Sequence, residues 1–150
     1  MNGLIVHDIP EVKHSTMVVA FAGWPDAAEA ATRAIRYLVR KLPTQKIMEI
    51  DPESYYDFTV NRPQTRINRR KERIIKWPCN EFYSYIPEDN PENAVLFYVG
   101  TEPNLKWKTF SNTVLEVADK VGVDLVVSLG ALLDAVPHTR EVRILSLIHI

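Results

Sequence analysis

Seven side chains that could bind a ligand or take part in catalysis lie in three loops, and each loop follows a short apolar run of the chain. The loops span residues 23–26, 100–104 and 130–140, and the apolar runs span 17–21, 94–99 and 123–129. If these runs are parallel strands, their carboxyl ends meet at one edge of the sheet, where open α/β sheets build binding sites. Carboxylates, an imidazole and a guanidinium gathered there would suit acid–base chemistry or the holding of a polar ligand. The predicted ligand-binding residues are Trp24, Asp26, Glu102, Asn104, Asp134, His138 and Arg140.

An ordinary structural explanation exists for several of these residues. Asp26 suits the positive end of a helix, Glu102 is compatible with a turn, and Asp134 with solvent. His138 would act as an acid or base beside Asp134, or would simply be a histidine of a surface loop. Since the sequence leaves both alternatives open, we predict ligand binding but no catalytic residue.

Other kinds of site receive less support from the sequence. The three loops lack the glycine-rich spacing that lets backbone amides approach a phosphate, and Asp26 would repel an anion at the helix terminus. His7, His14, His138 and His149 show neither a two-histidine helical spacing nor cysteine partners for zinc. Cys79 is the only cysteine, and we interpret it as a packed residue rather than a nucleophile. We therefore predict no metal and no cofactor.

A basic run occupies the middle of the chain. We interpret residues 69–72 as the exposed tip of a hairpin whose charges are solvated and are offset by acidic residues between 81 and 92. The alternatives are a nucleic-acid patch and a contact with a neighbouring subunit, and we predict no nucleic-acid partner. The basic residues are Arg62, Arg66, Arg69, Arg70, Lys71, Arg73 and Lys76.

The composition is that of one globular domain. The chain has 150 residues, of which 46% are hydrophobic and 25% charged, and its formal net charge is -1. Such a balance creates no overall field that favours nucleic acid or an anionic membrane. We find no signal peptide and no stretch of roughly 20 apolar residues, the length that crosses a bilayer. The single cysteine fits a reducing compartment, so we predict a cytoplasmic protein without a membrane partner.

Two amphipathic helices are predicted from apolar spacing. The first begins at Pro25, a favourable residue for a first helical turn, and places Ala27, Ala31, Ala34, Leu38 and Leu42 on its apolar face. The second carries Trp107, Phe110, Val114, Val117 and Val121 on one face, and Gly122 follows as its cap.

Strands are predicted at residues 4–6, 16–21, 46–50, 94–99 and 123–129, with 94–99 and 123–129 expected as central, parallel strands. Residues 54–88 show little helical periodicity and predict short strands and a β-hairpin inserted into the α/β chain. The alternation of strands and helices predicts a three-layer α/β/α sandwich with a mixed, mostly parallel sheet.

Four motifs in register carry a resemblance to a known family. They are residues 21–28 (FAGWPDAA), 57–63 (DFTVNRP), 100–107 (GTEPNLKW) and 130–140 (GALLDAVPHTR). In this order and spacing they resemble the proteasome assembly chaperone 2 family, in its prokaryotic branch. The match covers nearly all of residues 3–143.

The resemblance implies a fold related to the phosphorylase/hydrolase-like α/β/α sandwiches, a homo-oligomer such as a trimer, and proteasome subunits as partners. It supplies no catalytic residues. Our leading hypothesis is a non-catalytic protein that binds other proteins during assembly. The alternative is a small-molecule enzyme, hydrolase/phosphorylase-like or ligase-like, that uses the polar cleft at the strand ends.

The carboxyl-terminal residues of the chain are unusual. Residues 145–150 read LSLIHI, which is also what one frame of a common sequencing-library adapter would encode. Members of the family that the chain resembles are roughly twice as long. We therefore expect residues 1–150 to be a single domain truncated at its carboxyl end, with 145–150 non-native.

Overall fold

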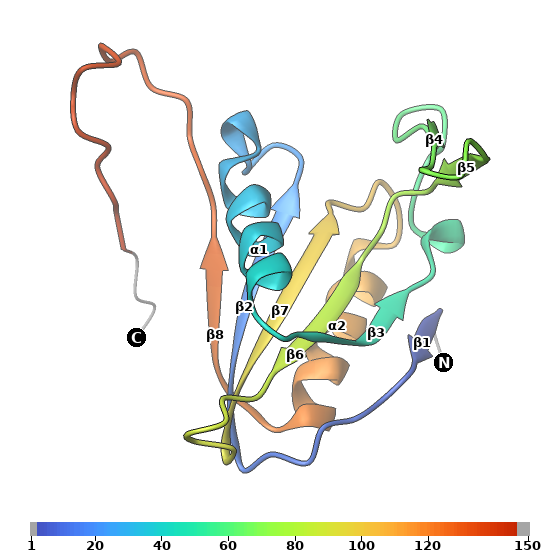
Figure 1. Cartoon of the computed structure of the whole chain (residues 1–150). Coiled ribbons are helices and arrows are strands. Elements are labelled where there is room, and N and C mark those ends of the chain that lie inside the picture. The colour runs from blue at the N-terminus through green and yellow to red at the C-terminus, as the bar shows by residue number, and fades with distance from the viewer. Residues whose placement is uncertain (1–2, 147–150) are drawn as a thin grey trace.

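A six-stranded mixed sheet forms the centre of the computed structural model, which describes residues 3–146 (Figure 1). Its strand order is β1-β3-β6-β7-β2-β8. The pairs β7–β2 and β2–β8 are parallel, while β1–β3, β3–β6 and β6–β7 are antiparallel, so the sheet is mixed, as predicted, but antiparallel pairs rather than parallel ones are in the majority. The strands are β1 (Leu4–Val6), β2 (His14–Ala22), β3 (Gln45–Ile50), β6 (Glu81–Tyr85), β7 (Asn93–Thr101) and β8 (Val123–Leu129).

Helix α1 (Ala30–Lys41) covers one face of the sheet, and α2 (Trp107–Val121) lies on the opposite face (Figure 1). Ile35 of α1 is fully buried and belongs to a cluster with Ala20 and Phe97. Phe110 and Val117 of α2 pack into the larger cluster, which contains Met17 and Tyr98 among others. The two helices and the sheet form the predicted three-layer α/β/α arrangement.

The first helix begins later than its apolar spacing predicts. Residues Ala27–Glu29 form a short 3-10 turn, and the φ angles of Ala28 (54°) and Glu29 (57°) lie in the left-handed region. These two residues interrupt the helix, so that α1 starts at Ala30. The prediction of Ala34 on the buried face was consequently wrong, because Ala34 is exposed and Ile35 takes its place.

The second helix follows its prediction closely. Phe110, Val114, Val117 and Val121 are buried, and Gly122 ends the helix with a φ of 71°, in the left-handed region that glycine tolerates. Trp107 differs from the prediction, since about half of its surface is exposed. It lies in the first turn of α2, where the helix reaches the edge of the sheet.

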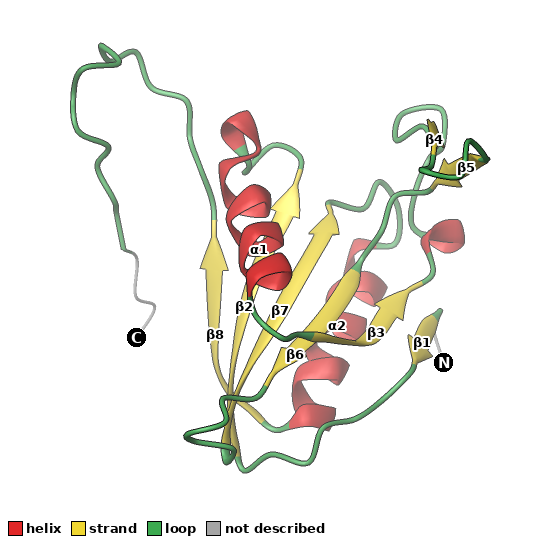
Figure 2. Cartoon of the chain, viewed as in Figure 1, coloured by secondary structure: helices red, strands yellow, loops and turns green. Residues whose placement is uncertain are grey.

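The inserted region is smaller than predicted. A separate two-stranded hairpin of β4 (Gln64–Ile67) and β5 (Arg73–Lys76) stands away from the main sheet and follows a 3-10 turn at η2 (Pro52–Ser54) (Figure 2). The prediction that residues 81–86 belong to the insertion was wrong. Strand β6 pairs with both β3 and β7 in the main sheet, because its alternating Phe82 and Ser84 are buried against the core.

Strand β8 lies at an edge of the sheet rather than at its centre. Among residues 3–146 it pairs only with β2, and most of its residues are exposed. It is parallel to β7, as predicted, but β2 lies between the two. The expectation about residues 145–150 falls largely on 147–150, which lie outside the described residues. Neither α1 nor α2 has both the length and the apolar character that crossing a membrane requires.

Candidate functional site

The three predicted loops meet at the carboxyl ends of β7, β2 and β8, which are adjacent and parallel. Backbone hydrogen bonds join the loops to one another. The Glu102 amide donates to the Ala22 carbonyl (2.9 Å), and the Ala131 amide donates to the Pro25 carbonyl (2.7 Å). The Trp24 amide donates to Oε2 of Glu102 at 3.0 Å. Hydrogen bonds thus hold the three loops together at one edge of the sheet, as the prediction of parallel strands implied.

Asp26 is buried within this edge and holds the start of α1. Its Oδ1 accepts hydrogen bonds from the backbone amides of Ala31 (2.8 Å) and Thr32 (3.3 Å), and its Oδ2 accepts from the Thr32 hydroxyl (2.5 Å). Only 6% of the residue is exposed. The carboxylate therefore satisfies amides that a helix start leaves without partners. This geometry matches the structural explanation that the sequence left open.

Glu102 and Asn104 are also engaged with neighbouring loops. The carboxylate of Glu102 lies over Gly23, where an added Cβ would come within 2.4 Å of its Oε2. Oδ1 of Asn104 accepts hydrogen bonds from the Asp57 amide (3.0 Å) and from Nδ2 of Asn61 (2.7 Å). Asn104 therefore ties the loop after β7 to the residues that precede the hairpin.

The other predicted residues lie on exposed chain. Asp134, His138 and Arg140 follow β8 on an extended segment that runs away from the sheet (Figure 1). Asp134 accepts a hydrogen bond from the amide of the adjacent Ala135 (2.8 Å). Trp24 is 86% exposed. In the described part of the chain, no hydrogen bond or ion pair joins these side chains to Asp26, Glu102 or Asn104, and ligand binding by the seven residues stays a prediction.

An apolar groove lies on the α2 side of the same edge. It has a volume of about 370 Å³ and is lined mainly by Phe21, Trp107, Phe110 and Leu115. Trp107 and Leu115 of α2 are each about half exposed. Strand β8 adds further exposed apolar surface, with Leu125 at 56%, Val126 at 47% and Val127 at 37%. Apolar surface of this kind is typical of protein contacts.

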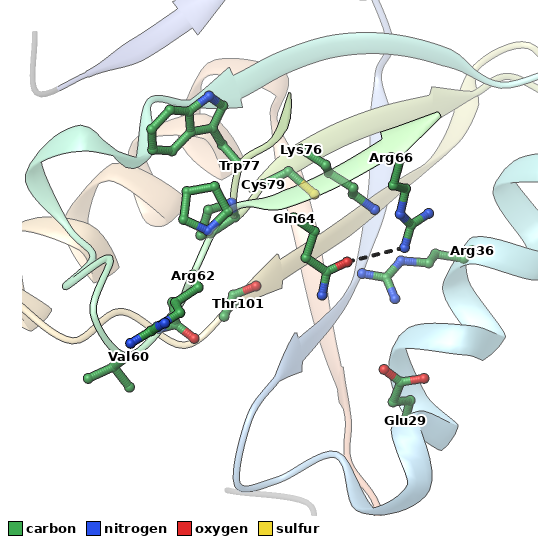
Figure 3. Close-up of a pocket in the computed structure, with 13 residues that line it drawn as sticks. Glu29, Arg36, Val60, Arg62, Gln64, Arg66, Lys76, Trp77, Cys79 and Thr101 are labelled. Atoms are coloured by element: carbon green, nitrogen blue, oxygen red, sulfur yellow. Dashed lines mark hydrogen bonds between the residues drawn. The ribbon is translucent and has the colours of Figure 1, made fainter. Parts of the chain in front are cut away.

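A larger and more polar cleft lies on the other side, between α1 and the hairpin (Figure 3). Its volume is about 500 Å³. Basic side chains from α1, β4 and β5 enter it, together with Cys79 and Trp77. The basic run is visible in the sequence, but its fourth partner in the cleft, Arg36, lies on α1 and is distant in sequence. In the sequence, only the charge of Arg36 hints that it belongs to this cleft, because the tertiary fold brings it close to the hairpin.

A buried polar network lies near this cleft. Oδ1 of Asn80 accepts hydrogen bonds from the Tyr56 hydroxyl (2.9 Å), the Tyr98 hydroxyl (3.0 Å) and the Thr101 amide (3.1 Å). Burial raises the pKa of both phenols above the ordinary value, which keeps them protonated as donors. The network joins the insertion, the start of β6 and the end of β7.

The described residues contain no metal centre that could define the site. Within 3–146, no three His, Cys, Asp or Glu side chains gather closely enough to hold a metal ion.

Comparisons with known proteins agree on the family of this fold. The model of the PAC2 family matches residues 20–149. A PAC2 family protein from Streptomyces avermitilis is 39% identical, with a TM-score of 0.76 over 84% of this chain and 53% of its own. A proteasome-assembly chaperone homologue from Mycobacterium tuberculosis is 42% identical, with a TM-score of 0.75 over 83% of this chain and 52% of its own.

A more distant solved structure shares the fold alone. It is an archaeal proteasome activator from Pyrococcus furiosus, 14% identical, with a TM-score of 0.61 over 83% of this chain and 49% of its own. No significant match was found among the curated proteins. The chain spans about half the length of the solved structures that it matches.

Proposed function

Because this chain belongs to the PAC2 family, we propose that it is a non-catalytic protein that binds other proteins during assembly, with proteasome subunits as partners. Support comes from the likeness to a proteasome-assembly chaperone homologue at 42% identity. The four motifs read from the sequence point to the same family.

The observation that carries the proposal is the exposed apolar surface of β8 and α2. Leu125, Val126 and Val127 are partly exposed on an edge strand, and Trp107 and Leu115 are half exposed beside the apolar groove. Within residues 3–146 the outer edge of β8 has no partner strand, and apolar side chains on such an edge favour contact with another polypeptide segment. We propose that this surface receives the protein partner.

We further propose that the protein works as a homo-oligomer, such as a trimer, in the cytoplasm. A ring of identical subunits would present several copies of the β8 surface to a partner. The unremarkable net charge of -1 is compatible with a protein that binds through apolar rather than electrostatic contacts.

The enzyme alternative has weaker support from the geometry. Asp26 is buried and holds the start of α1, and Oε2 of Glu102 accepts the Trp24 amide beside Gly23, so both carboxylates have structural roles in this arrangement. Asp134, His138 and Arg140 lie on exposed chain, where water screens their charges. Protein binding therefore remains the better-supported function.

Co-purification with matched variants tests the proposal. The tagged chain would be expressed in its source organism, and the proteins recovered with it identified by mass spectrometry. We expect proteasome subunits with the unchanged chain, and their loss with Val126→Lys, which places a charge on the apolar strand. Ile67→Lys makes the same kind of change at an exposed apolar residue of β4, in the separate two-stranded sheet, and should retain the partner. Recovery without any proteasome subunit would contradict the proposal.

A further inference from the structure

The cleft between α1 and the hairpin gathers positive charge from separate parts of the chain. Arg36 comes from α1, Arg66 from β4 and Lys76 from β5, while Arg62 precedes the hairpin. Figure 3 shows the head groups of Arg36, Arg66 and Lys76 pointing toward one another across the cleft. The tertiary fold, not the sequence order, therefore creates the concentration of charge.

These cations are not neutralised by the protein. Among the described residues, no carboxylate lies within ion-pair distance of Arg36, Arg62, Arg66 or Lys76. The side chains of Arg66 and Arg62 make long hydrogen bonds to neutral oxygens, to Gln64 Oε1 (3.4 Å) and to the Thr59 carbonyl (3.3 Å), respectively. Like charges that converge in a partly enclosed space repel one another, and a bound anion would relieve the repulsion.

The acidic residue in the cleft does not offset this charge. Glu29 is the only carboxylate in the described lining, and it accepts hydrogen bonds from Nε (3.0 Å) and Nη2 (2.7 Å) of Arg33, outside the cleft. Four cations thus face one engaged carboxylate, in a protein whose overall net charge is -1. The excess of positive charge is local.

We propose that this cleft binds the phosphate group of a small organic phosphate. Two guanidinium groups and an ammonium supply donors for several oxygens, and the fork geometry of arginine matches phosphate. A phosphate monoester carries close to two negative charges at neutral pH, which suits the local excess better than a single carboxylate. The volume of about 500 Å³ is typical of sites for small molecules.

An apolar wall indicates what the rest of the ligand is like. Trp77, Val60, Pro63 and Pro78 also line the cleft, and Figure 3 shows Trp77 and Val60 on the side away from Arg36 and Arg66. The Trp77 ring packs edge-on against Phe58, with ring centroids 4.9 Å apart, and remains 46% exposed. A fixed and partly exposed indole offers a surface on which an aromatic or apolar part of the ligand would lie. The proposed ligand therefore joins a phosphate to an apolar group.

Isothermal titration calorimetry on the full 150-residue chain tests the proposal, with phenyl phosphate, inorganic phosphate and benzoate as probes. We expect saturable binding of phenyl phosphate that is tighter than binding of inorganic phosphate, because Trp77 contributes to the former only. Benzoate should bind at least about tenfold more weakly than phenyl phosphate, since it offers one charge and fewer oxygens. Binding of phenyl phosphate should weaken as salt increases.

Paired variants separate a specific site from general attraction. Arg36→Gln and Arg66→Gln should each weaken phenyl phosphate binding by at least about tenfold, because each removes a charge-assisted contact. Their controls are Arg40→Gln, on the same helix, and Arg70→Gln, on the same hairpin, since neither residue lines the cleft. The controls should bind as the unchanged chain does, and circular dichroism would show that all variants fold.

Three results would overturn the proposal. They are the absence of saturable phenyl phosphate binding, an equal loss in the cleft variants and their controls, and benzoate binding as tight as that of phenyl phosphate. The proposal is independent of protein binding at β8, because no residue of β8 or α2 lines the cleft. Failure of one would leave the other standing, and Val126→Lys should not change phosphate affinity.

Discussion

The Tyr98 hydroxyl donates a hydrogen bond of 3.0 Å to Oδ1 of Asn80, and the two groups fill the space that a side chain on Gly100 would occupy. A Cβ added to Gly100 would lie 2.2 Å from the Tyr98 hydroxyl and 2.4 Å from Asn80 Oδ1. Both side chains are buried, and the same oxygen also accepts from Tyr56 and from the Thr101 amide. The close packing of β7 against the start of β6 therefore depends on the absence of a side chain at residue 100.

Gly100→Ala should destabilise the protein by about 1–3 kcal/mol, the usual cost of overpacking a core, because the Tyr98–Asn80 contact would have to shift. Urea denaturation would measure the change in the free energy of unfolding. Gly130→Ala is the matched control, since its added Cβ would meet only the Pro25 carbonyl, at 3.4 Å. Equal stability of the two variants would show that the buried contact tolerates the extra methyl.

Asp26→Ala should destabilise the protein by about 1–2 kcal/mol, as expected when the residue that caps a helix is lost. The variant removes the acceptor of the Ala31 and Thr32 amides and leaves the Thr32 hydroxyl buried with a poorer partner. Thermal and chemical denaturation would both detect the loss. Asp134→Ala removes a carboxylate from exposed chain and should change stability by less than about 0.5 kcal/mol. If Asp26→Ala were as stable as the unchanged chain, the structural role of this carboxylate would be contradicted.

The sequence predicts an element of this fold well where the spacing of nearby apolar residues determines that element. The second helix was predicted almost completely, because apolar residues recur at helical spacing and Gly122 stops the helix. The first helix was misplaced, because left-handed backbone at Ala28 and Glu29 interrupts a sequence that looks helical. Strand β6 has the alternation of a strand, but alternation does not say which sheet a strand joins.

The candidate sites show the same difference between local and distant information. Parallel strands predicted that three loops share an edge, and the structure joins them there. The order of residues could not show that Asp26 turns inward to Thr32 while Asp134 stays on exposed chain. Nor could it bring Arg36 next to Arg66 and Lys76, since that arrangement depends on how the hairpin stands against α1.

Ionisation of the Tyr83 phenol should lower the stability of the protein in alkaline solution. Burial raises the pKa of its phenol from 10.0 to about 12, and the Glu81 carboxylate, which accepts a hydrogen bond from that phenol at 3.1 Å, adds to the rise. Because the unfolded chain releases this proton at lower pH than the folded chain, the stabilisation is complete below pH 10 and falls as pH rises toward 12. Tyr56 and Tyr98 contribute in the same direction.

Tyr83→Phe should therefore flatten the decline in the free energy of unfolding between pH 10 and 12, measured by urea denaturation at several pH values. Tyr37→Phe is the control, because Tyr37 is 54% exposed on α1 and should leave the decline as it is. An unchanged slope in Tyr83→Phe would mean that the phenol titrates alike in the folded and unfolded chains.

The reactivity of Cys79 offers a test of the electrostatics inside the basic cleft. Burial raises the pKa of the thiol, the Glu81 charge raises it further, and the charges of Lys76 and Arg36 lower it. Since the thiolate is the reactive form, the folded chain should react more slowly with a disulfide reagent than the urea-unfolded chain does.

Two variants test the charges around Cys79. Glu81→Gln should speed the reaction, and Lys76→Gln should slow it. The chain has a single cysteine, so the absorbance of the released thiol reports this site alone. If both variants change the rate in the same direction, altered exposure of Cys79 would explain the effect better than charge.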